Sequence, residues 1–281
     1  MMNHPDPDRP APDLIVIPAR FGSTRLPGKP LLALAGHTLL ERVVANARRA
    51  ADLARHCEVV VATDDDRIID HARMLGVRAI MTDPALTSGS ARAHAAALTM
   101  SGGGDAPERI INIQGDAPFI PPDTIAALIE TLRQGTADVA TPVYRLDWDR
   151  LEQLRAHKNV APFSGTTCAR DARGHALWFS KLILPAMRGE AELRREPLSP
   201  VWQHLGLYAF TSAALDWFVS TPAGTYEKLE GLEQLRFLEH GWQIATIPVE
   251  PPHHALSGID TPEDLAAAEA AIARFGDPFP V

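Results

Sequence analysis

The stretch that decides the fold reads Leu14-Ile15-Val16-Ile17-Pro18-Ala19-Arg20-Phe21-Gly22-Ser23-Thr24-Arg25-Leu26-Pro27-Gly28-Lys29-Pro30. Its first four residues are apolar and mostly β-branched, which favours a buried strand. The turn-forming segment after them holds Arg20, Arg25 and Lys29 among glycines and hydroxyls. Glycine lets the backbone approach a ligand closely, and Arg and Lys form charge-assisted hydrogen bonds to phosphate oxygens. The stretch therefore predicts a strand that ends in a polyphosphate-binding loop, with a solvated basic loop as the alternative.

Two common nucleotide motifs are absent from this loop. It has neither the Gly-Lys-Ser/Thr of a Walker loop nor the Gly-x-Gly-x-x-Gly of a dinucleotide-binding turn. We therefore expect a different type of nucleotide site.

Composition sets the class of protein. The chain has 281 residues, of which 46% are hydrophobic and 22% charged, enough for one large domain over residues 13–281 after a disordered tail at 1–12. A formal net charge of −8 argues against nucleic-acid binding. Cys57 and Cys168 are the only cysteines, so we expect no disulfide framework or cysteine zinc site. With no apolar run of membrane-spanning length, we expect a soluble cytoplasmic protein without membrane association.

Strands and helices alternate along the first part of the chain. The patterns predict strands at 14–19, 58–63 and 77–81 and helices at 31–51 and 67–75. Later strands are expected at 109–113, 137–143, 176–181, 202–210 and 243–249, and later helices at 91–100, 125–133, 148–155, 215–219, 227–239 and from 262 onward. The alternation predicts an α/β fold, with a doubly wound, mostly parallel sheet and helices on both faces.

Ligands of such sheets bind beyond the carboxyl ends of the strands, where several polar groups are expected. Asp116 follows a strand in Gln114-Gly115-Asp116 and either holds Mg²⁺ beside a phosphate or forms a turn. Ser88 and Gly89 precede a helix and suit either a ligand contact or an ordinary N-cap. We interpret residues 64–66, three aspartates, as helix capping and solvated charge. The charged segment 188–196 is a candidate mobile lid.

Six motifs, taken together and in order, resemble the 3-deoxy-manno-octulosonate (KDO) cytidylyltransferases, the CMP-KDO synthetases of lipopolysaccharide biosynthesis. The motifs are the loop at 18–30, Val61-Ala-Thr-Asp64, Gln114-Gly-Asp116, His204-Leu-Gly-Leu-Tyr208, Leu232-Glu-Gln-Leu-Arg236 and Asp260-Thr-Pro-Glu-Asp-Leu265. The resemblance covers about residues 13–274. It implies the nucleotidyltransferase fold, a homodimer, Mg²⁺, CTP as substrate, and an acceptor-binding and dimerisation sub-region at about 144–240.

The resemblance also implies roles for individual residues. Asp116 and Asp260 would hold the magnesium and, with Lys29 and Arg20, form the catalytic group. The nucleotide-binding residues would be Pro18, Ala19, Arg20, Gly22, Ser23, Arg25, Lys29, Ser88 and Gly89. The acceptor sugar would be bound by Gln114, Lys181, Arg188, His204, Tyr208, Glu233 and Gln234. The implied reaction is attack of the anomeric hydroxyl of KDO on the α-phosphorus of CTP, which gives CMP-KDO and pyrophosphate.

Four positions depart from the family's pattern. Ala117 replaces the Glu that usually follows Gln-Gly-Asp, and Ala91 replaces the Glu of Ser-Gly-Thr-Glu-Arg. Thr167 lies where the family's Asn-x-Val-Lys strand carries Lys, and Lys181 lies where Arg is usual. Lys cannot reproduce the bidentate grip of Arg on a carboxylate. The departures concern the acceptor more than CTP or the metal.

Other functions are compatible with parts of this pattern. The same CTP chemistry could act on another acidic sugar or on a phosphonate. A non-catalytic nucleotide-binding paralogue is a second alternative, against which Asp116 and Asp260 argue together. A glycosyltransferase that uses a preformed nucleotide sugar would need an Asp-x-Asp motif, a spacing that residues 64–66 contain.

Overall fold

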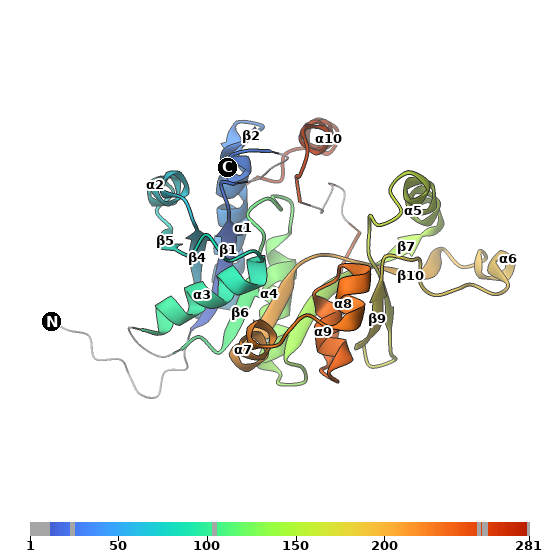
Figure 1. The fold of residues 1–281 in the computed structure, drawn as a ribbon. Helices are drawn as coiled ribbons and strands as arrows, with labels where there is room; N and C mark the ends of the chain where they lie inside the picture. Colours follow the sequence, from blue (N-terminus) through green and yellow to red (C-terminus); the bar gives the residue numbers. More distant parts are fainter. Residues whose placement is uncertain (1–11, 23–25, 103–105, 252–253, 255–257, 280–281) are drawn as a thin grey trace.

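A computed structural model of the chain describes residues 12–22, 26–102, 106–251, 254 and 258–279. The main sheet has the strand order β5-β4-β1-β6-β11-β7-β10-β8-β9, and β12 pairs with β7 (Figure 1). Its strands are β1 (Asp13–Ala19), β4 (Cys57–Thr63), β5 (Arg78–Met81), β6 (Arg109–Asn112), β7 (Val139–Asp147), β8 (Thr167–Arg170), β9 (Ala176–Ser180), β10 (Leu198–His204), β11 (Tyr208–Thr211) and β12 (Ile244–Pro248). A small hairpin is formed by β2 (Ala33–Leu34) and β3 (His37–Thr38).

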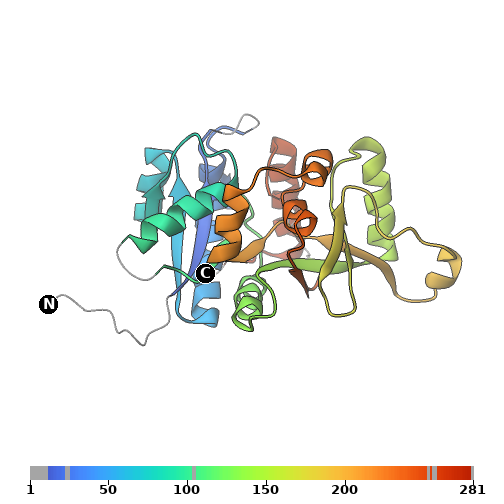
Figure 2. The same cartoon turned by 60° about the horizontal axis from the view of Figure 1, so that its bottom comes forward.

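The helices connect and cover these strands. They are α1 (Leu39–Ala54), α2 (Asp66–Met74), α3 (Gly89–Ser101), α4 (Pro122–Arg133), α5 (Trp148–Val160), α6 (Glu190–Leu193), α7 (Ser212–Ser220), α8 (Thr225–Glu230), α9 (Gln234–Glu239) and α10 (Pro262–Phe275), with a 3₁₀ turn η1 (Lys29–Leu31). Figure 2 shows α6 at the opposite end of the molecule from α2 and β5.

The sheet has a parallel half and a largely antiparallel half. β1 pairs in parallel with both β4 and β6, and β4 pairs in parallel with β5. β11 is antiparallel to β6 and β7, and β10 is antiparallel to β7 and β8, whereas β12 is parallel to β7. The expected α/β class is confirmed, and β11 joins the two halves into one continuous sheet.

Alternating side chains of β1 face two separate layers of helices. Ile15 and Ile17 pack in a core that includes buried residues of α1, α2 and α4. Leu14 and Val16 point to the other face, where α3, α7 and α9 contribute. Because both faces of β1 are covered, an uninterrupted apolar run is the pattern this strand requires.

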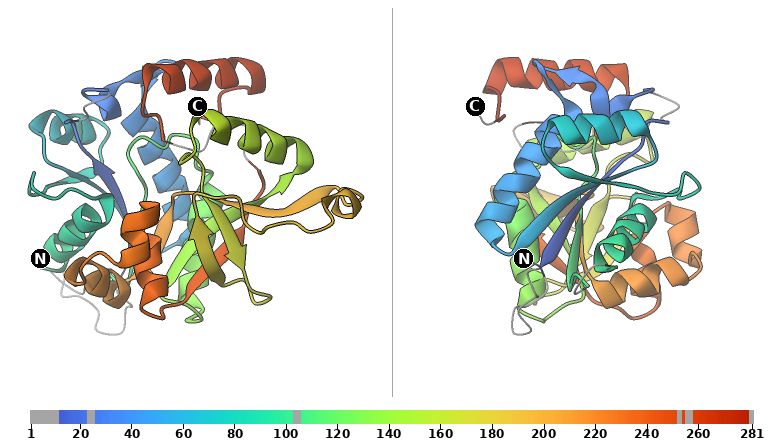
Figure 3. Two further views of the ribbon diagram at one scale, coloured as in Figure 1. Left: turned by 45° about the vertical axis from the view of Figure 1, so that its right-hand side comes forward. Right: turned by 90° about the vertical axis from the view of Figure 1, so that its left-hand side faces the viewer.

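Helix α10 crosses the end of the sheet and packs on the β2–β3 hairpin (Figure 3). Ile259 and Ala268 are buried there against Leu34, Leu39 and Phe119. Beyond the helix, Asp277 accepts two hydrogen bonds from the guanidinium of Arg42, at 2.7 and 2.8 Å. The Arg42 side chain is only 1% exposed, so this pair anchors the end of α10 to α1.

Three expected elements are wrong in their extent. The helix expected at 31–51 begins only at Leu39, because η1 and the hairpin turn at Gly36 (φ 85°) come first. The single strand expected at 202–210 is two strands separated by a turn around Gly206. The helix expected at 227–239 ends at Gly231, whose left-handed φ of 64° stops α8 before α9 begins.

Segment 188–196 contains the short helix α6 rather than a wholly irregular chain. Its Glu190 accepts hydrogen bonds from Arg155 at 2.7 and 2.9 Å and from Arg194 at 2.8 Å. These contacts join the segment to α5, and its role as a lid stays a prediction. Residues 1–11 of the expected tail lie outside the described part of the chain.

Candidate active site

Lys29 joins the two aspartates that the sequence singled out for magnesium. Its Nζ contacts the carboxylate of Asp116 and lies 2.8 Å from Oδ1 of Asp260. Burial alone lowers the pKa of Lys29, but the carboxylates of Asp116 and Asp260 outweigh burial and raise this pKa above its usual value. The ammonium group therefore stays charged and neutralises part of the charge on the two acids.

Local backbone contacts bring these residues together. β1 and β6 are parallel neighbours, so the loops that follow them emerge at the same edge of the sheet. The N–H of Gly115 donates to the carbonyl of Pro18 at 3.0 Å, and a Cβ at position 115 would lie only 3.0 Å from the same oxygen. The N–H of Ile259 donates to the carbonyl of Asp116 at 2.9 Å, which holds the segment carrying Asp260 against this loop.

A second charged network surrounds Arg20. Its Nε lies 3.4 Å from Oδ2 of Asp64, and the same oxygen is 3.0 Å from the fully buried Arg92. Asp65 caps α2 as expected, since its side chain accepts from the N–H of Arg67. For Asp64, however, the capping interpretation is wrong, because this carboxylate bridges two arginines instead.

The other nucleotide-binding candidates lie near these networks. Pro18 and Ala19 end β1, and Arg20 and Gly22 follow directly. Ser88 is the N-cap of α3, accepting from the N–H of Ala91, which confirms its capping role and leaves its ligand contact a prediction. A Cβ at Gly89 would lie 2.5 Å from the amide nitrogen of Gln114, so this turn adjoins the end of β6. Ser23 and Arg25 lie outside the described residues.

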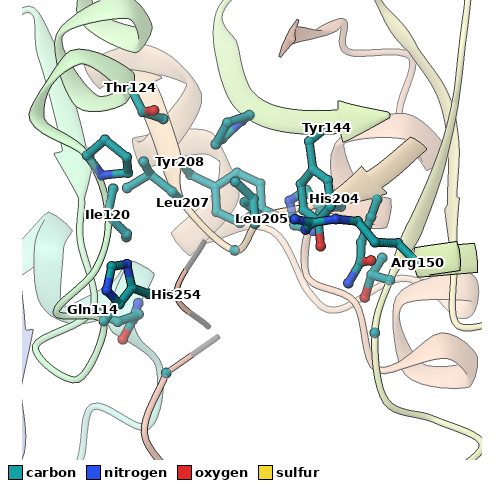
Figure 4. A pocket seen from close by; sticks show the side chains of 18 of the residues that line it. Gln114, Ile120, Thr124, Tyr144, Arg150, His204, Leu205, Leu207, Tyr208 and His254 are labelled. Carbon is teal, nitrogen blue, oxygen red and sulfur yellow. The ribbon is translucent and has the colours of Figure 1, made fainter. Parts of the chain in front are cut away.

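A cavity of about 950 Å³ includes Asp116 in its wall. Figure 4 shows Gln114, His204 and Tyr208 around it. Its wall includes six of the seven residues proposed for the acceptor, namely Gln114, Lys181, His204, Tyr208, Glu233 and Gln234. Arg188 is exposed in the turn before α6 and does not belong to this wall, and its predicted contact with the acceptor stays a prediction.

Two of the elements whose extent differs from the prediction, the strand at 202–210 and the helix at 227–239, explain how four of these side chains reach the cavity. The turn at Gly206 places His204 at the end of β10 and Tyr208 at the start of β11, where both line the same wall. The break at Gly231 places Glu233 and Gln234 at the start of α9 rather than inside a helix. Gln234 Nε2 is buried and has no hydrogen-bond partner among the described residues, an arrangement that suits an oxygen of a ligand.

His204 is held as a neutral imidazole. Thr141 Oγ1 donates to the carbonyl of Leu207 at 2.8 Å, so the 2.9 Å contact between this oxygen and His204 Nε2 is a bond donated by the imidazole. Burial, and then the charge of Lys181, lower the pKa of His204 to about 3. With Nε2 protonated, Nδ1 is a hydrogen-bond acceptor.

Burial shifts the pKa values of three more cavity groups, Tyr208, Glu233 and Lys181, toward their neutral forms. It raises the pKa of the Tyr208 phenol well above its ordinary range, and it raises the pKa of Glu233 although Ser90 donates a 3.0 Å hydrogen bond to that side chain. It lowers the pKa of Lys181, whose Nζ lies 3.2 Å from Thr166 Oγ1.

Sequence reasoning missed several residues of the cavity wall. Tyr144, Arg150 and His254 line it (Figure 4). Thr166 lines it as well, as do Arg274 and Phe275 at the end of α10. None of them belongs to the six motifs, and only the fold brings their elements together. Within the described ranges, no cluster of three or more His, Cys, Asp or Glu side chains forms a metal site.

Comparison with known proteins identifies the family. The cytidylyltransferase family model matches residues 14–245. The chain belongs to the cytidylyltransferase family. The 3-deoxy-manno-octulosonate cytidylyltransferase of Maricaulis maris is 39% identical over 94% of this chain and 98% of its own length. The enzyme of the same name from Anaeromyxobacter dehalogenans is 42% identical over 92% of this chain and 97% of its own length.

Solved structures of cytidylyltransferases resemble this one. A CMP:2-keto-3-deoxy-manno-octonic acid synthetase, complexed with CTP, superimposes with a TM-score of 0.77 at 32% identity and covers 94% of this chain and 99% of its own. A cytidylyltransferase from Leptospira borgpetersenii, at 18% identity and a TM-score of 0.56 over 95% of this chain and 88% of its own, shares the fold. The expected nucleotidyltransferase fold and the enzyme class, a CTP-dependent nucleotidyltransferase, are confirmed. No helix in the described residues is long and apolar enough to cross a membrane.

Proposed function

We propose that this cytidylyltransferase transfers CMP from CTP to the anomeric hydroxyl of 3-deoxy-D-manno-octulosonate, releasing pyrophosphate and supplying CMP-KDO for lipopolysaccharide biosynthesis. The observation that carries the proposal is the cavity beside Asp116, where six side chains expected to bind the acceptor come together from four separate parts of the chain. The names of the relatives support the same acceptor.

The nucleotide would bind at the edge formed by β1 and β6. Arg20 and Lys29 are the described cations there, and both suit the oxygens of a triphosphate. To reach the phosphates, Lys29 would exchange some of its contact with Asp116 and Asp260 for phosphate oxygens. Arg20 is 43% exposed and needs little rearrangement to do so. The backbone of Pro18 and Ala19 would contact the cytosine.

Asp116 and Asp260 fit a magnesium ion. The Lys29 ammonium lies between their carboxylates, which shows that the pair accepts a positive charge at this place. Mg²⁺ prefers one or two carboxylates together with substrate phosphates, which is the donor set available here. When bound, the ion would neutralise charge on the triphosphate and polarise the α-phosphate. Asp116 and Asp260 would hold it, and Lys29 and Arg20 would hold the phosphates.

The cavity would orient the sugar for attack. Nδ1 of neutral His204 can accept a hydrogen bond from a sugar hydroxyl, and the Gln234 amide can donate one to a sugar oxygen. Lys181 is one of the cations in the cavity wall, with Arg150 and Arg274, and it would face the acceptor's carboxylate. The anomeric oxygen would form a bond to the α-phosphorus as the bond from that phosphorus to the pyrophosphate oxygen breaks, and the proton of the hydroxyl would pass to solvent. Positioning and charge neutralisation suffice for this step, with no covalent enzyme intermediate.

Pyrophosphate release tests the proposal. The purified protein, with CTP and Mg²⁺, is given KDO and, in parallel, other acidic sugars and a phosphonate. We expect pyrophosphate and a CMP-sugar with KDO, and no pyrophosphate with KDO would contradict the proposal. The second candidate, another acidic acceptor, is favoured by Lys181 at an Arg position, because Lys holds a carboxylate less specifically.

We also propose that the enzyme is a cytoplasmic homodimer, as its resemblance to the family implies. Apolar side chains are exposed around the end of α5, where Val160 is 87% and Phe163 78% exposed, which supports an interface there. Light scattering on the purified protein would give twice the mass of one chain. A mass of one chain at working concentration would contradict the dimer.

A further inference from the structure

Lys158 holds together two segments of the acceptor cavity without lining it. Its Nζ donates to the carbonyl of Ser164 at 2.6 Å, to that of Gly165 at 3.0 Å and to that of Lys181 at 2.5 Å. The carbonyl of Pro162 lies 3.5 Å from the same Nζ, so the three short bonds and this longer contact engage an ammonium group that has three N–H donors. Every N–H of Lys158 therefore has a backbone carbonyl within reach, and none is left for a substrate.

The three carbonyls come from two stretches that both reach the cavity. Gly165 and Thr166 lie just before β8, Lys181 lies just after β9, and all three belong to the cavity wall. Thr166 and Lys181 are also joined by the 3.2 Å contact between Oγ1 and Nζ. Without a cation, three carbonyl oxygens that converge on one point would repel one another and lack donors.

Gly165 keeps this corner tight against α5. Its φ of 63° is left-handed, and a Cβ there would lie 3.0 Å from Cδ1 of Leu154. One turn further along α5, Lys158 reaches the carbonyl of the same glycine. Packing and hydrogen bonding thus place the turn at 164–166 against α5 from two directions.

The cation also compensates for a change in the sequence. Thr167 stands where the resemblance predicts Lys, and its hydroxyl donates to the carbonyl of Leu182 at 2.6 Å and accepts from the N–H of Leu184 at 3.0 Å. Position 167 therefore supplies no charge here. Lys158 brings one from α5, near enough to Lys181 that, after burial, the charge of Lys181 is the next cause lowering the pKa of Lys158.

We propose that Lys158 is a positioning residue for the acceptor, which fixes Thr166 and Lys181 in the cavity by binding the carbonyls of residues 164, 165 and 181. This inference rests on the proposed function. It assigns Lys158 an effect on the acceptor and none on CTP, because its bonds lie in the antiparallel half of the sheet, whereas Lys29 and Asp116 follow β1 and β6 of the parallel half.

Steady-state kinetics of K158M, K158R and the control K228M test the assignment. Lys228 is an exposed lysine of α8 outside the cavity wall. We expect K158M to raise the KM for KDO about tenfold, with the KM for CTP within about twofold of wild type. K158R, which keeps the charge and its donors, should recover most of that loss, and K228M should match wild type. Hydrogen exchange of the backbone over residues 164–168 should be faster in K158M alone.

The wild-type protein decides the proposed function separately. If it releases pyrophosphate with another acceptor of the panel and not with KDO, the proposed function fails, and the variants are compared with that acceptor. The inference is overturned if the KM for the acceptor in K158M changes no more than in K228M, or if the KM values for CTP and acceptor rise together. Should K158M fail to fold, G165A takes its place, because it displaces the same turn, and the same outcomes apply.

Discussion

At the proposed nucleotide end of the site, charged side chains face one another, whereas the proposed acceptor cavity includes four groups whose pKa values are shifted toward the neutral form. Lys29 lies between Asp116 and Asp260, and its pKa is raised because these carboxylates outweigh the effect of burial. In the cavity, burial lowers the pKa values of Lys181 and His204 and raises those of Tyr208 and Glu233.

The difference corresponds to two kinds of ligand. When a triphosphate binds with its metal, ion pairs within the protein are replaced by ion pairs with the ligand. Binding at the charged end therefore costs little electrostatic free energy. A sugar presents many neutral hydroxyls, which pair best with donors and acceptors that carry no charge needing water. If the proposed ligands bind as described, the comparison teaches that opposed charges serve the phosphates. The cavity instead adds groups that favour their neutral forms, which suit hydroxyls, to the few charges that the acceptor's carboxylate needs.

Asp116→Asn should have the largest effect, and we expect that effect on turnover rather than on binding of the acceptor. Removing one of the two carboxylates that would hold the metal is expected to lower kcat about a thousandfold while the KM for the acceptor changes little. Pyrophosphate release measures both constants. Asp123→Asn, an exposed carboxylate in the first turn of α4, is the control and should be unchanged. If Asp116→Asn kept its turnover, the charged end would not be where the chemistry occurs.

Asp277→Asn tests helix α10, which extends from the charged end of the site to the cavity. α10 begins next to Asp260 and ends at Arg274 and Phe275 in the cavity wall, and the Arg42–Asp277 pair anchors it. The variant leaves a buried guanidinium without its counter-charge, which should cost about 2 kcal/mol in the free energy of unfolding, since Asp277 is partly exposed. Urea unfolding measures it. The KM values for CTP and acceptor should both rise, and a change in only one would show that the two ends are anchored separately.

His204 provides a pH test of the neutral cavity. Its pKa of about 3 in the folded protein lies below the usual 6.5, so its contribution to stability is complete above pH 6.5 and is lost as the pH falls toward 3. The free energy of unfolding should fall by at most about 1.4 kcal/mol per pH unit from this one group. Unfolding of wild type and His204→Asn is compared between pH 6.5 and 5, with exposed His157→Asn as control. An equal slope in all three proteins would mean that His204 titrates normally.

Ionic strength should change the KM for CTP more than the KM for the acceptor, and this is the smallest of the expected effects. Screening shortens the reach of exposed charges from about 10 Å at 0.1 M salt to about 3 Å at 1 M. We expect the KM for CTP to rise several-fold over this range, and that for the acceptor by less than about twofold, because a sugar with one carboxylate carries far less charge than a triphosphate. Equal salt dependence of the two KM values would show that the charged end and the cavity do not differ in how they bind their ligands.

Much of the parallel half of the fold could be predicted from the sequence. β1 contains an apolar run over 14–19 and β4 one over 59–62, and the Asp65 and Ser88 caps are local signals that act within a few residues. The elements that form the cavity wall are harder to predict from the sequence, because the turn at Gly206 and the break at Gly231 interrupt otherwise continuous patterns. A glycine inside a periodic run does not by itself say whether the element continues.

The sequence by itself determined the strand from Leu14 to Ala19, the cationic loop after it and, through six motifs, the family of the enzyme. Only the tertiary structure decided that Lys29 bridges Asp116 and Asp260, that Asp64 joins Arg20 to Arg92, and that Lys158 pins the cavity corner at Gly165 and Lys181. The physical reason is the range of the interactions. Strand and cap preferences act between residues close in the chain, whereas ion pairs and burial depend on which distant elements the packed sheet brings side by side.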